Sequence, residues 1–389
     1  PAFAYINPAY YGGDTGANLW AWWINFALVD GKMRGLFTML FGASAILIAE
    51  RAAGHKPGPW QTHYLRMFWL FFFGLINAYL IFSGDILVCY ALAGLVIFPF
   101  RKLKPGVLIG IGAAILAADL AFHVWQNGQA RALAIAAGQP GASAATVAAL
   151  KDLLVTMAPA PGALEQQLAA FRGGFMDALK ARMEFAIFLQ TQFLPTDEIP
   201  EAIGQMLIGM GLYRAGFFTL RWTSRQYLAV IAFGYLVAAP VNAWLGSQIV
   251  AAKFDPISLN YFGAWSAAPR PFIALAHACV VLLAVRAWPR NFLIDRLSAA
   301  GRMALSNYLG AGILSVVIFC GFGLGLYGRL ERAQLYLVVL AIWAVTLIWS
   351  KPWMERFHYG PFEWVWRSLV RMKPQPFVKR PLKAAEAAA

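Results

Sequence analysis

Residues 64–82 read YLRMFWLFFFGLINAYLIF, and residues 86–100 read ILVCYALAGLVIFPF. Only the tripeptide SGD separates these two apolar runs, and the first run carries a single charged side chain, Arg66. A helix needs about 20 mostly apolar residues to cross the hydrocarbon core of a bilayer. The pattern therefore predicts two membrane helices joined by a very short turn.

Similar apolar runs recur along most of the chain. They are Met33–Ala49, Pro105–Val124, Glu201–Leu220, Gln226–Gly246, Pro271–Trp288, Met303–Gly321 and Ala333–Ser350. The chain is 60% hydrophobic and 13% charged, far from the composition of a soluble domain. The runs are too long for barrel strands and do not alternate apolar with polar residues. We expect an all-α, polytopic transmembrane bundle of about nine or ten membrane helices, with external amphipathic helices.

Basic residues collect in every second gap between the apolar runs, and the formal net charge is +14. Such alternation is typical of loops on the cytoplasmic side of a membrane. The charge is therefore attributed to orientation and to contact with membrane lipids, and no nucleic-acid partner is expected. The basic groups are Arg51/Lys56/Arg66, Arg101/Lys102/Lys104, Arg214/Arg221/Arg225, Arg286/Arg290/Arg296/Arg302 and the stretch from Lys351 to Lys383, which predicts a cytoplasmic C-terminus.

The same alternation divides the chain into five segments. The first span should run from outside to inside, so residues 1–32 are predicted to be external and interfacial, and a further span upstream of Pro1 is expected. The Pro-containing end of the chain lacks the composition of a packed segment. The predicted order is an external segment (1–32), a four-helix group (33–124), an external amphipathic insert (125–200), a second helix group (201–372) and a disordered cytoplasmic tail (373–389).

Asp85 is the strongest candidate for a functional side chain. It occupies the outer turn between the two quoted runs, and an ionisable group near membrane depth is costly unless it is paired or hydrated. A carboxylate at this point can cap the following helix. It can also serve as a general base or orient a substrate. Both interpretations stay open.

A second charged cluster, Asp30, Lys32 and Arg34, lies at the outer end of the run Met33–Ala49. Basic residues on this side oppose the general orientation of charge. They are predicted either to form salt bridges with Asp30 or Asp85 or to bind an anion or acyl donor. Together with Asn77 and Asp85, they place any ligand pocket among the outer ends of the runs Met33–Ala49, Tyr64–Phe82 and Ile86–Phe100.

Two histidines lie inside apolar runs. His277 is in the middle of its span and is interpreted either as a hydrogen-bonded core residue or as a proton relay. Asp119 and His123 are four residues apart, so they share one face of a helix and are expected to form a structural pair.

Four residues predicted at the inner side complete the candidate set. Arg302 and Asn307 belong to the segment GRMALSNY (301–308), in which Asn307 is expected to join helices or bind a ligand. Glu363 lies in the first turn of a helix predicted by GPFEWVWR (360–367). Arg66 begins the run quoted first. The cysteines lack metal-ligand spacing, so no metal site is predicted.

Four segments, in this order and spacing, resemble the YeiB-type family of bacterial inner-membrane proteins, which is catalogued as a domain of unknown function. They are LFTMLFG (36–42) followed by Arg51, GLIN (74–77) with GDILVCYALAG (84–94), GRMALSNY (301–308) and GPFEWVWR (360–367). The resemblance implies a bacterial inner-membrane location. The family usually has a further N-terminal helix, and it usually has His where this chain has Asn77.

That family is distantly similar to membrane acyltransferases, which implies an enzyme that uses acyl-CoA or another acyl donor and a lipid, sugar or small-molecule acceptor. Asp85 would then be the base, Lys32 and Arg34 would stabilise negative charge, and Arg66 and Arg302 would attract a phosphate-bearing donor. A permease for a small amphipathic solute, with His277 and Asp119 in its pathway, is one alternative. A non-catalytic lipid-binding or assembly subunit is the other, and the oligomeric state stays open.

Overall fold

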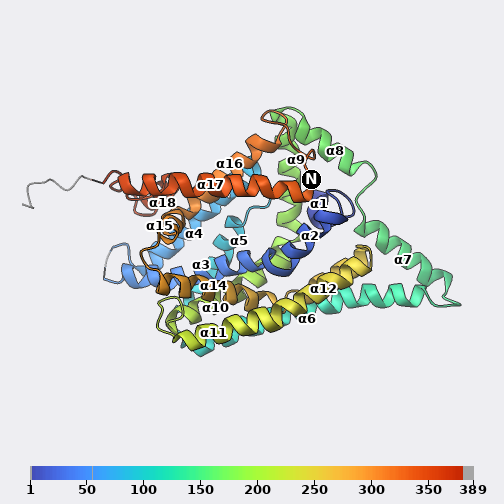
Figure 1. Ribbon diagram of the computed structural model, residues 1–389, viewed down its shortest axis with the longest axis horizontal. Coiled ribbons are helices and arrows are strands. Elements are labelled where there is room, and N and C mark those ends of the chain that lie inside the picture. Colours follow the sequence, from blue (N-terminus) through green and yellow to red (C-terminus); the bar gives the residue numbers. More distant parts are fainter. Residues whose placement is uncertain (1, 55, 380–389) are drawn as a thin grey trace, which may run out of the picture.

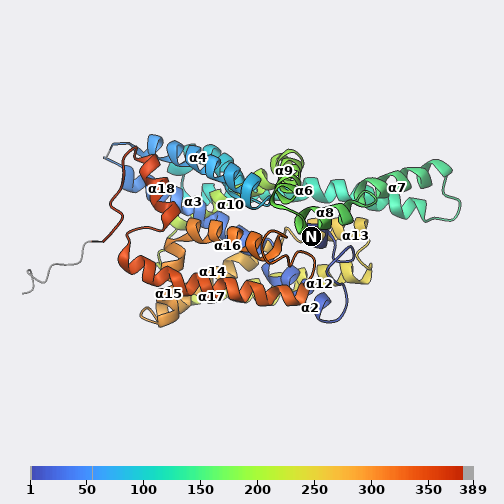
Figure 2. The same cartoon turned by 90° about the horizontal axis from the view of Figure 1, so that it is seen from above.

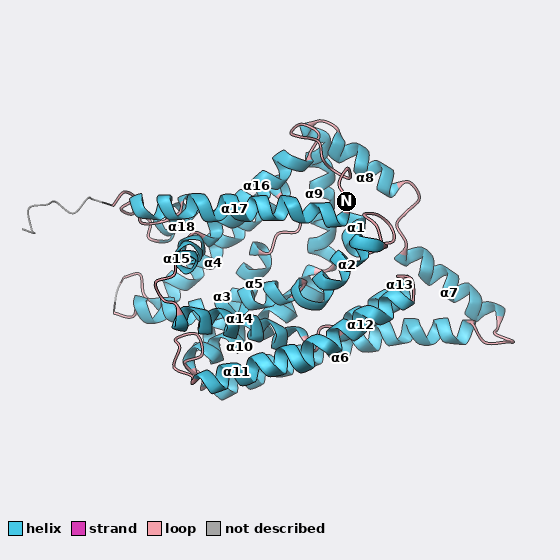
Figure 3. Ribbon diagram, in the orientation of Figure 1, coloured by secondary structure: helices cyan, strands magenta, loops and turns pink. Residues whose placement is uncertain are grey.

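The computed structural model describes residues 2–54 and 56–379, and every regular element in this part of the chain is helical (Figures 1 and 3). The contact of Phe357 with Val378 is an isolated bridge. This architecture confirms the predicted all-α class. It also fits a lipid environment, because helices satisfy their backbone hydrogen bonds internally where water is absent.

Six helical segments of the described residues are long and apolar enough to cross a membrane. They are Gly16–Ala52, Pro59–Ile81, Pro105–Ala137, Ser224–Ala251, Arg270–Ala287 and Arg332–Arg356. A seventh arises if α15 (Phe292–Arg302) and α16 (Ala304–Phe319), which are bent by 85° at their junction, together form one span. The count is lower than the predicted nine or ten, because two expected spans are short helices enclosed by the others.

The first of these short helices is α5, in the first helix group. This group comprises α3 (Lys32–Ala52), α4 (Pro59–Ile76) with η2 (Asn77–Ile81), α5 (Leu87–Ile97) with η3 (Phe98–Lys102), and α6 (Pro105–Ala137). With 11 residues, α5 is about 16 Å long, roughly half the thickness of a bilayer core. Most of its side chains are buried between α3, α4 and α10 (Ile199–Arg214). Its apolar character therefore reflects a protein core and not contact with lipid.

The other short helix, α10, packs backbone to backbone against α3 and α6. A Cβ atom on Gly209 would lie 1.9 Å from the carbonyl oxygen of Met39, and one on Gly42 would lie 2.1 Å from that of Met206. Glycine is required at both positions for this close approach. The α3–α10 pair that results runs through the interior and carries polar residues at both of its ends.

The insert between the two helix groups lies mostly at one end of the bundle (Figure 2). It extends α6 to Ala137 and adds α7 (Ala144–Met157), α8 (Ala163–Arg172), α9 (Phe175–Gln192) and η4 (Leu194–Glu198). Part of it enters the bundle, because Arg182 on α9 is only 2% exposed and donates to the carbonyl of Leu80 at 2.6 Å. The predicted external insert thus also forms part of the core.

The second group packs around these helices. It consists of α10, α11 (Ser224–Phe233) with η5 (Gly234–Ala238) and α12 (Ala239–Ala251), α13 (Pro256–Trp265), α14 (Arg270–Ala287), α15, α16, α17 (Arg332–Arg356) and α18 (Pro361–Val370). Only 6% of the most apolar window of α17 is buried, whereas α10 is buried along most of its length. In a membrane, α17 would therefore face lipid, and α10 faces protein.

The N-terminal segment differs from its prediction. It forms α1 (Ala2–Ile6), α2 (Gly16–Ile24) and η1 (Asn25–Val29), and the last two continue into α3 as one apolar run of 37 residues. Gly31 breaks this run with a φ of +74°, a conformation that suits glycine. Residues 16–32 are therefore part of the first candidate span and not only an interfacial segment.

The start of the C-terminal tail is also ordered, in contrast to the predicted disorder from residue 373. Phe377 packs between Phe357 and Trp364 with tilted rings, whose centroids lie 4.6 and 5.1 Å from its own. The backbone N–H of His358 donates to the carbonyl of Phe377 at 2.9 Å. Aromatic burial of this kind offsets the cost of ordering the proline-containing chain. The rest of the predicted tail, 380–389, lies outside the described residues.

Candidate functional site

Asp85 lies in the turn between η2 and α5, where its carboxylate joins three elements. Oδ2 accepts from the backbone N–H of Val88 at 2.9 Å, which caps the first turn of α5. Oδ1 accepts from Nδ2 of Asn77 on η2 at 2.7 Å and from the hydroxyl of Tyr308 on α16 at 3.3 Å. The predicted cap is therefore present, together with side-chain partners that capping alone does not require.

Burial raises the pKa of Asp85 to about 6, although its hydrogen bonds to Val88 and Asn77 act in the opposite direction. The carboxylate is mostly ionised at neutral pH and is a better proton acceptor than an ordinary aspartate. These are the properties required of a general base in the turn between two helices.

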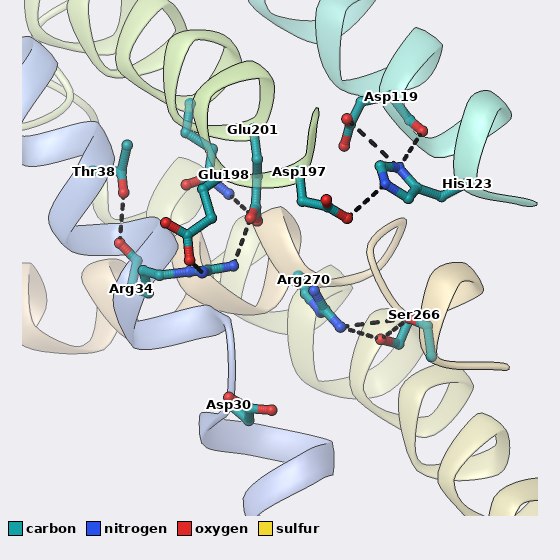
Figure 4. Close-up of polar contacts among 12 residues, drawn as sticks. Asp30, Arg34, Thr38, Asp119, His123, Asp197, Glu198, Glu201, Ser266 and Arg270 are labelled. Carbon is teal, nitrogen blue, oxygen red and sulfur yellow. Dashed lines mark hydrogen bonds and ion pairs between the residues drawn. The ribbon is translucent and has the colours of Figure 1, made fainter. Parts of the chain in front are cut away.

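Arg34 pairs with carboxylates at the η4–α10 junction (Figure 4). Its Nη2 lies 2.6 Å from Oε2 of Glu201, and its Nη1 lies 3.9 Å from Oε1 of Glu198. Oε1 of Glu201 accepts from Nε2 of Gln205 at 2.8 Å. Sequence reasoning treated Glu201 only as the start of a span and did not select Glu198, because their cation is supplied by a distant helix.

A small cavity of about 10 Å³ lies beside this ion pair, with room for roughly one water molecule. The hydroxyl groups of Thr38 and Tyr90 are 2.6 Å apart at its wall. Ile86, which follows Asp85, also lines the cavity. It brings the Asp85 turn next to Arg34, Glu198, Glu201 and Gln205, which together form the Arg34 cluster. We expected the outer end of α4 as a third wall, but α10 is there instead. The lining residues are Arg34, Thr38, Ile86, Cys89, Tyr90, Glu198, Glu201, Ala202 and Gln205.

Asp30 and Lys32 lie outside this cluster, so the predicted salt bridges among Asp30, Lys32, Arg34 and Asp85 are wrong. Lys32 is 1% exposed, and its Nζ donates to the carbonyl of Phe26. Asp30 accepts from the hydroxyl of Tyr5 at 3.0 Å, and in Figure 4 it is separate from the contacts of Arg34. The left-handed turn at Gly31 separates Asp30 from Arg34, whereas Lys32 begins α3 and turns its amine back to the carbonyl of Phe26.

The two histidines in apolar runs have different surroundings. His277 lies 2.6 Å from the hydroxyl of Tyr235 through Nδ1 and 2.8 Å from the carbonyl of Leu28 through Nε2, as expected of a hydrogen-bonded bundle residue. His123 lies 3.6 Å from the carboxylate of Asp119, which gives the predicted pair. Its other nitrogen lies 2.8 Å from Asp197, a partner that the sequence did not indicate. Asp197 precedes Glu198, so this network adjoins the Arg34 cluster.

Glu363 connects two of the sequence motifs noted above. Its Oε1 accepts from the backbone N–H groups of Leu305 and Ser306, at 2.7 and 3.0 Å, and its Oε2 accepts from the Ser306 hydroxyl. The carboxylate of α18 thereby caps the N-terminus of α16, where the helix dipole favours negative charge. These contacts assign Glu363 a structural role in joining α16 to α18.

The remaining inner candidates are also occupied by protein contacts or lie at the surface. Asn307 donates to the carbonyl of Ala300 at 2.9 Å and accepts from Nε1 of Trp349 at 3.0 Å. The guanidinium of Arg66 stacks 4.3 Å from the ring of Trp366. Arg302 is exposed at the end of α15. These residues do not converge with Asp85 on one site.

Membrane-length helices around a partly buried polar cluster define a polytopic α-helical membrane protein. In the described part of the chain, no group of His, Cys, Asp and Glu side chains has the geometry of a metal site. Residues 212–373 match the family "Protein of unknown function (DUF418)". No solved structure matches the chain.

Uncharacterised bacterial proteins are similar over nearly the whole chain. YeiB of Escherichia coli is 27% identical over 98% of this chain and 92% of its own length. YxaH of Bacillus subtilis is 28% identical over 89% of this chain and 80% of its own length. Together with the family match over residues 212–373, these similarities support the resemblance to the YeiB-type family that the sequence motifs indicated.

Proposed function

We propose that this protein is an acyltransferase-like enzyme of a bacterial inner membrane, with its reactive site at the Asp85 turn. The observation that supports the proposal best is the hydrogen-bonded set of Asp85, Asn77 and Tyr308, which adjoins the Arg34 cavity through Ile86. A half-buried carboxylate that three elements orient is suited to remove a proton from an acceptor.

In the proposed step, a hydroxyl or amine of the acceptor attacks the carbonyl carbon of an acyl donor such as an acyl-CoA. Asp85 takes the proton of the attacking group, the new acyl bond forms, and the bond to the donor's leaving group breaks. Arg34 is the nearby cation that can stabilise negative charge on the carbonyl oxygen. Lys32 is assigned no role in this step, because its amine is held by Phe26 and does not line the cavity.

The cavity is too small for an acceptor, so the proposed reaction requires the outer ends of α3, α5 and α10 to move apart. The family's usual His at the position of Asn77 is also relevant. A histidine there could donate to Asp85 as Asn77 does and could itself carry a proton. We therefore expect this chain to be slower than relatives that have His, and Asn77→His to increase its rate.

The test is Asp85→Asn, assayed by transfer of radiolabelled acetyl groups from acetyl-CoA in membranes and by complementation of a deletion strain. Transfer is expected to fall at least about a hundredfold, the usual contribution of a general base. The fold should persist, because Asn also caps helices. Asn77, whose Oδ1 has no partner among the described residues, can rotate its amide to accept from the new side chain.

The matched control is Asp30→Asn, which removes a carboxylate whose one hydrogen-bond partner among the described residues is Tyr5, and it should leave transfer unchanged. Wild-type transfer should fall below a pH of about 6, because the pKa of Asp85 is raised and its protonated form cannot accept a proton. Full activity of Asp85→Asn would refute the proposal.

One observation favours a proton-coupled permease as the second candidate. Titratable groups on α6, η4, α10 and α3 follow one another from Asp119 and His123 through Asp197 to the Arg34 cluster. Such a series can carry protons between helices. If this candidate is correct, purified protein in liposomes should acidify the lumen when its solute is supplied, and His123→Gln should abolish the flux without affecting acyl transfer.

The orientation inferred from the basic gaps, with the C-terminus in the cytoplasm and the Asp85 turn on the outer side, is a separate expectation. Cysteines introduced at residues 103 and 145 test it, because the native Cys89, Cys279 and Cys320 are buried and should react little. A membrane-impermeant thiol reagent added to intact cells should label position 145 and not position 103. The reverse labelling would overturn the orientation.

A further inference from the structure

The other end of the α3–α10 pair contains an open cleft of about 380 Å³, within the usual range for small-molecule sites. Glu50 near the end of α3 and Tyr213 and Arg214 at the end of α10 form two of its sides. Pro105 at the start of α6 and the loop residues Thr219 and Arg221 complete it. None of these residues belongs to the Asp85 site.

The loop that carries Thr219 and Arg221 is held in one shape by α14. Nη2 of Arg286 donates to the carbonyls of Leu220 and Trp222, at 2.7 and 2.6 Å. The indole of Trp222 donates to the carbonyl of Ala215 at 3.0 Å. Leu220 has a φ of +58°, which is unfavourable for a residue with a side chain and persists only where the surroundings impose it. The loop therefore forms a wall of the cleft whose conformation is fixed by these hydrogen bonds.

The charges that face the cleft are mainly positive. Arg214 uses Nη1 to bond the carbonyls of Lys102 and Leu103, at 3.3 and 3.0 Å, and among the described residues no hydrogen bond engages its Nε or Nη2. Arg221 is exposed and makes no ion pair with the residues that the structure describes. The single carboxylate of the lining, Glu50, accepts from the hydroxyl of Tyr213 at 3.1 Å.

The first turn of α6 adds to this positive potential, because Pro105 is at its N-terminal end. Arginine forks and a helix N-terminus are the groups with which proteins bind phosphate. Arginine is also suited to this task because two of its N–H groups can bond one phosphate together. The hydroxyl of Thr219 already donates to the carbonyl of Gly216 at 3.2 Å, so the arginines and the helix N-terminus supply the attraction for an anion.

We infer that this cleft is a binding site for a phosphomonoester. The volume accommodates a phosphate with a small attached group, and the ligand can come from the cytoplasm or from the headgroup of a membrane lipid. The inference goes beyond the proposed function, since it rests on the cleft alone and holds whether or not acyl transfer occurs.

The experiment uses two probes that share one phosphomonoester, with and without acyl chains. Purified protein in nanodiscs of zwitterionic lipid is titrated with glycerol 3-phosphate by calorimetry. In a second arm, nanodiscs contain phosphatidic acid, and retention of this lipid through detergent exchange is measured by mass spectrometry. Binding in the first arm identifies a soluble ligand, and retention in the second arm alone identifies a lipid headgroup.

Arg221→Gln is expected to weaken the bound probe about tenfold, the size of one charge-assisted contact. Arg221→Lys should weaken it less, because it keeps the charge but loses the fork. The matched control is Arg225→Gln, which removes an equal charge from an exposed residue in the first turn of α11 that does not line the cleft. Failure of both probes to bind, or equal weakening by Arg225→Gln, would overturn the inference.

Discussion

The two ends of the α3–α10 pair are built from the same helices but have opposite character. The end predicted to be outer encloses about 10 Å³ between Arg34 and the carboxylates of Glu198 and Glu201. The end predicted to be inner is an open cleft of about 380 Å³ with two arginines and one carboxylate. Part of the contrast follows from helix electrostatics, since acidic groups favour helix N-termini and basic groups favour C-termini.

Three residues of α3 oppose that rule, and two of them line a cavity, whereas the third, Lys32, bonds the carbonyl of Phe26. Arg34 is near the N-terminus of α3, and Glu50 is near its C-terminus. Each charge is unfavourable for its own helix and is compensated by α10, through Glu201 and through the hydroxyl of Tyr213. A charge that opposes the dipole of its own helix does not stabilise that helix, so Arg34 and Glu50 require another explanation than helix stability.

The largest effect is expected from a variant that forces α3 and α10 apart at their closest contact. Gly209→Leu would place a side chain where even a Cβ atom lies 1.9 Å from the carbonyl oxygen of Met39. Because that contact is backbone, the helices must separate, and no monodisperse folded protein should be recovered from detergent extracts.

Gly110→Leu on α6 is the control for this prediction, because nothing lies within 4 Å of a Cβ atom there. It should be extracted with an elution profile by size exclusion like that of the wild type. If Gly209→Leu behaved in the same way, the close α3–α10 contact would be incorrect.

A smaller effect is expected from the outer ion pair. Arg34→Gln leaves Glu198 and Glu201 together without their cation and should lower stability by about 1–2 kcal/mol, because the pair is only partly buried. Thermal melting in detergent measures this loss.

The double variant Arg34→Gln/Glu201→Gln should recover part of the lost stability, because it also removes one of the two repelling carboxylates. If the stability loss of the double variant equalled the sum of the losses in Arg34→Gln and Glu201→Gln, Arg34 and Glu201 would not interact. The ion pair would then no longer distinguish the two ends of the α3–α10 pair.

The smallest effect is expected at an exposed pair of the second helix group, Asp295 on α15 with Lys351 on α17. Water screens this pair, so Asp295→Asn should leave the melting temperature in detergent unchanged within error. A clear drop would mean that α15 and α17 are less exposed in the membrane protein than their surfaces indicate.

Sequence reasoning succeeded where the information is local. The apolar runs predicted the helices, and the turn at Asp85 predicted a cap on the helix that follows it. The pairing of Asp119 with His123 was also predicted, since residues four apart meet on one helix face.

Long-range partners could not be predicted in the same way. Glu201 follows Arg34 by 167 residues, and only the packing of α10 against α3 brings them together. Three acidic residues between Asp197 and Glu201, at the start of an apolar run with no basic neighbour, were the one available signal that a cation had to come from elsewhere. The burial of α5 and α10 could not be predicted from the sequence either, because the lipid-facing and protein-facing helices of this chain are equally apolar.

The crossing at Gly42 and Gly209 has a mechanical consequence. Two stiff rods that touch at a fixed point can tilt about it but cannot shift apart there without losing the contact. A ligand that wedges the inner ends of α3 and α10 would therefore change the gap between their outer ends in the same motion. The glycine contact is then the pivot of a lever, and its position along the helices sets how much movement at one membrane face is delivered to the other.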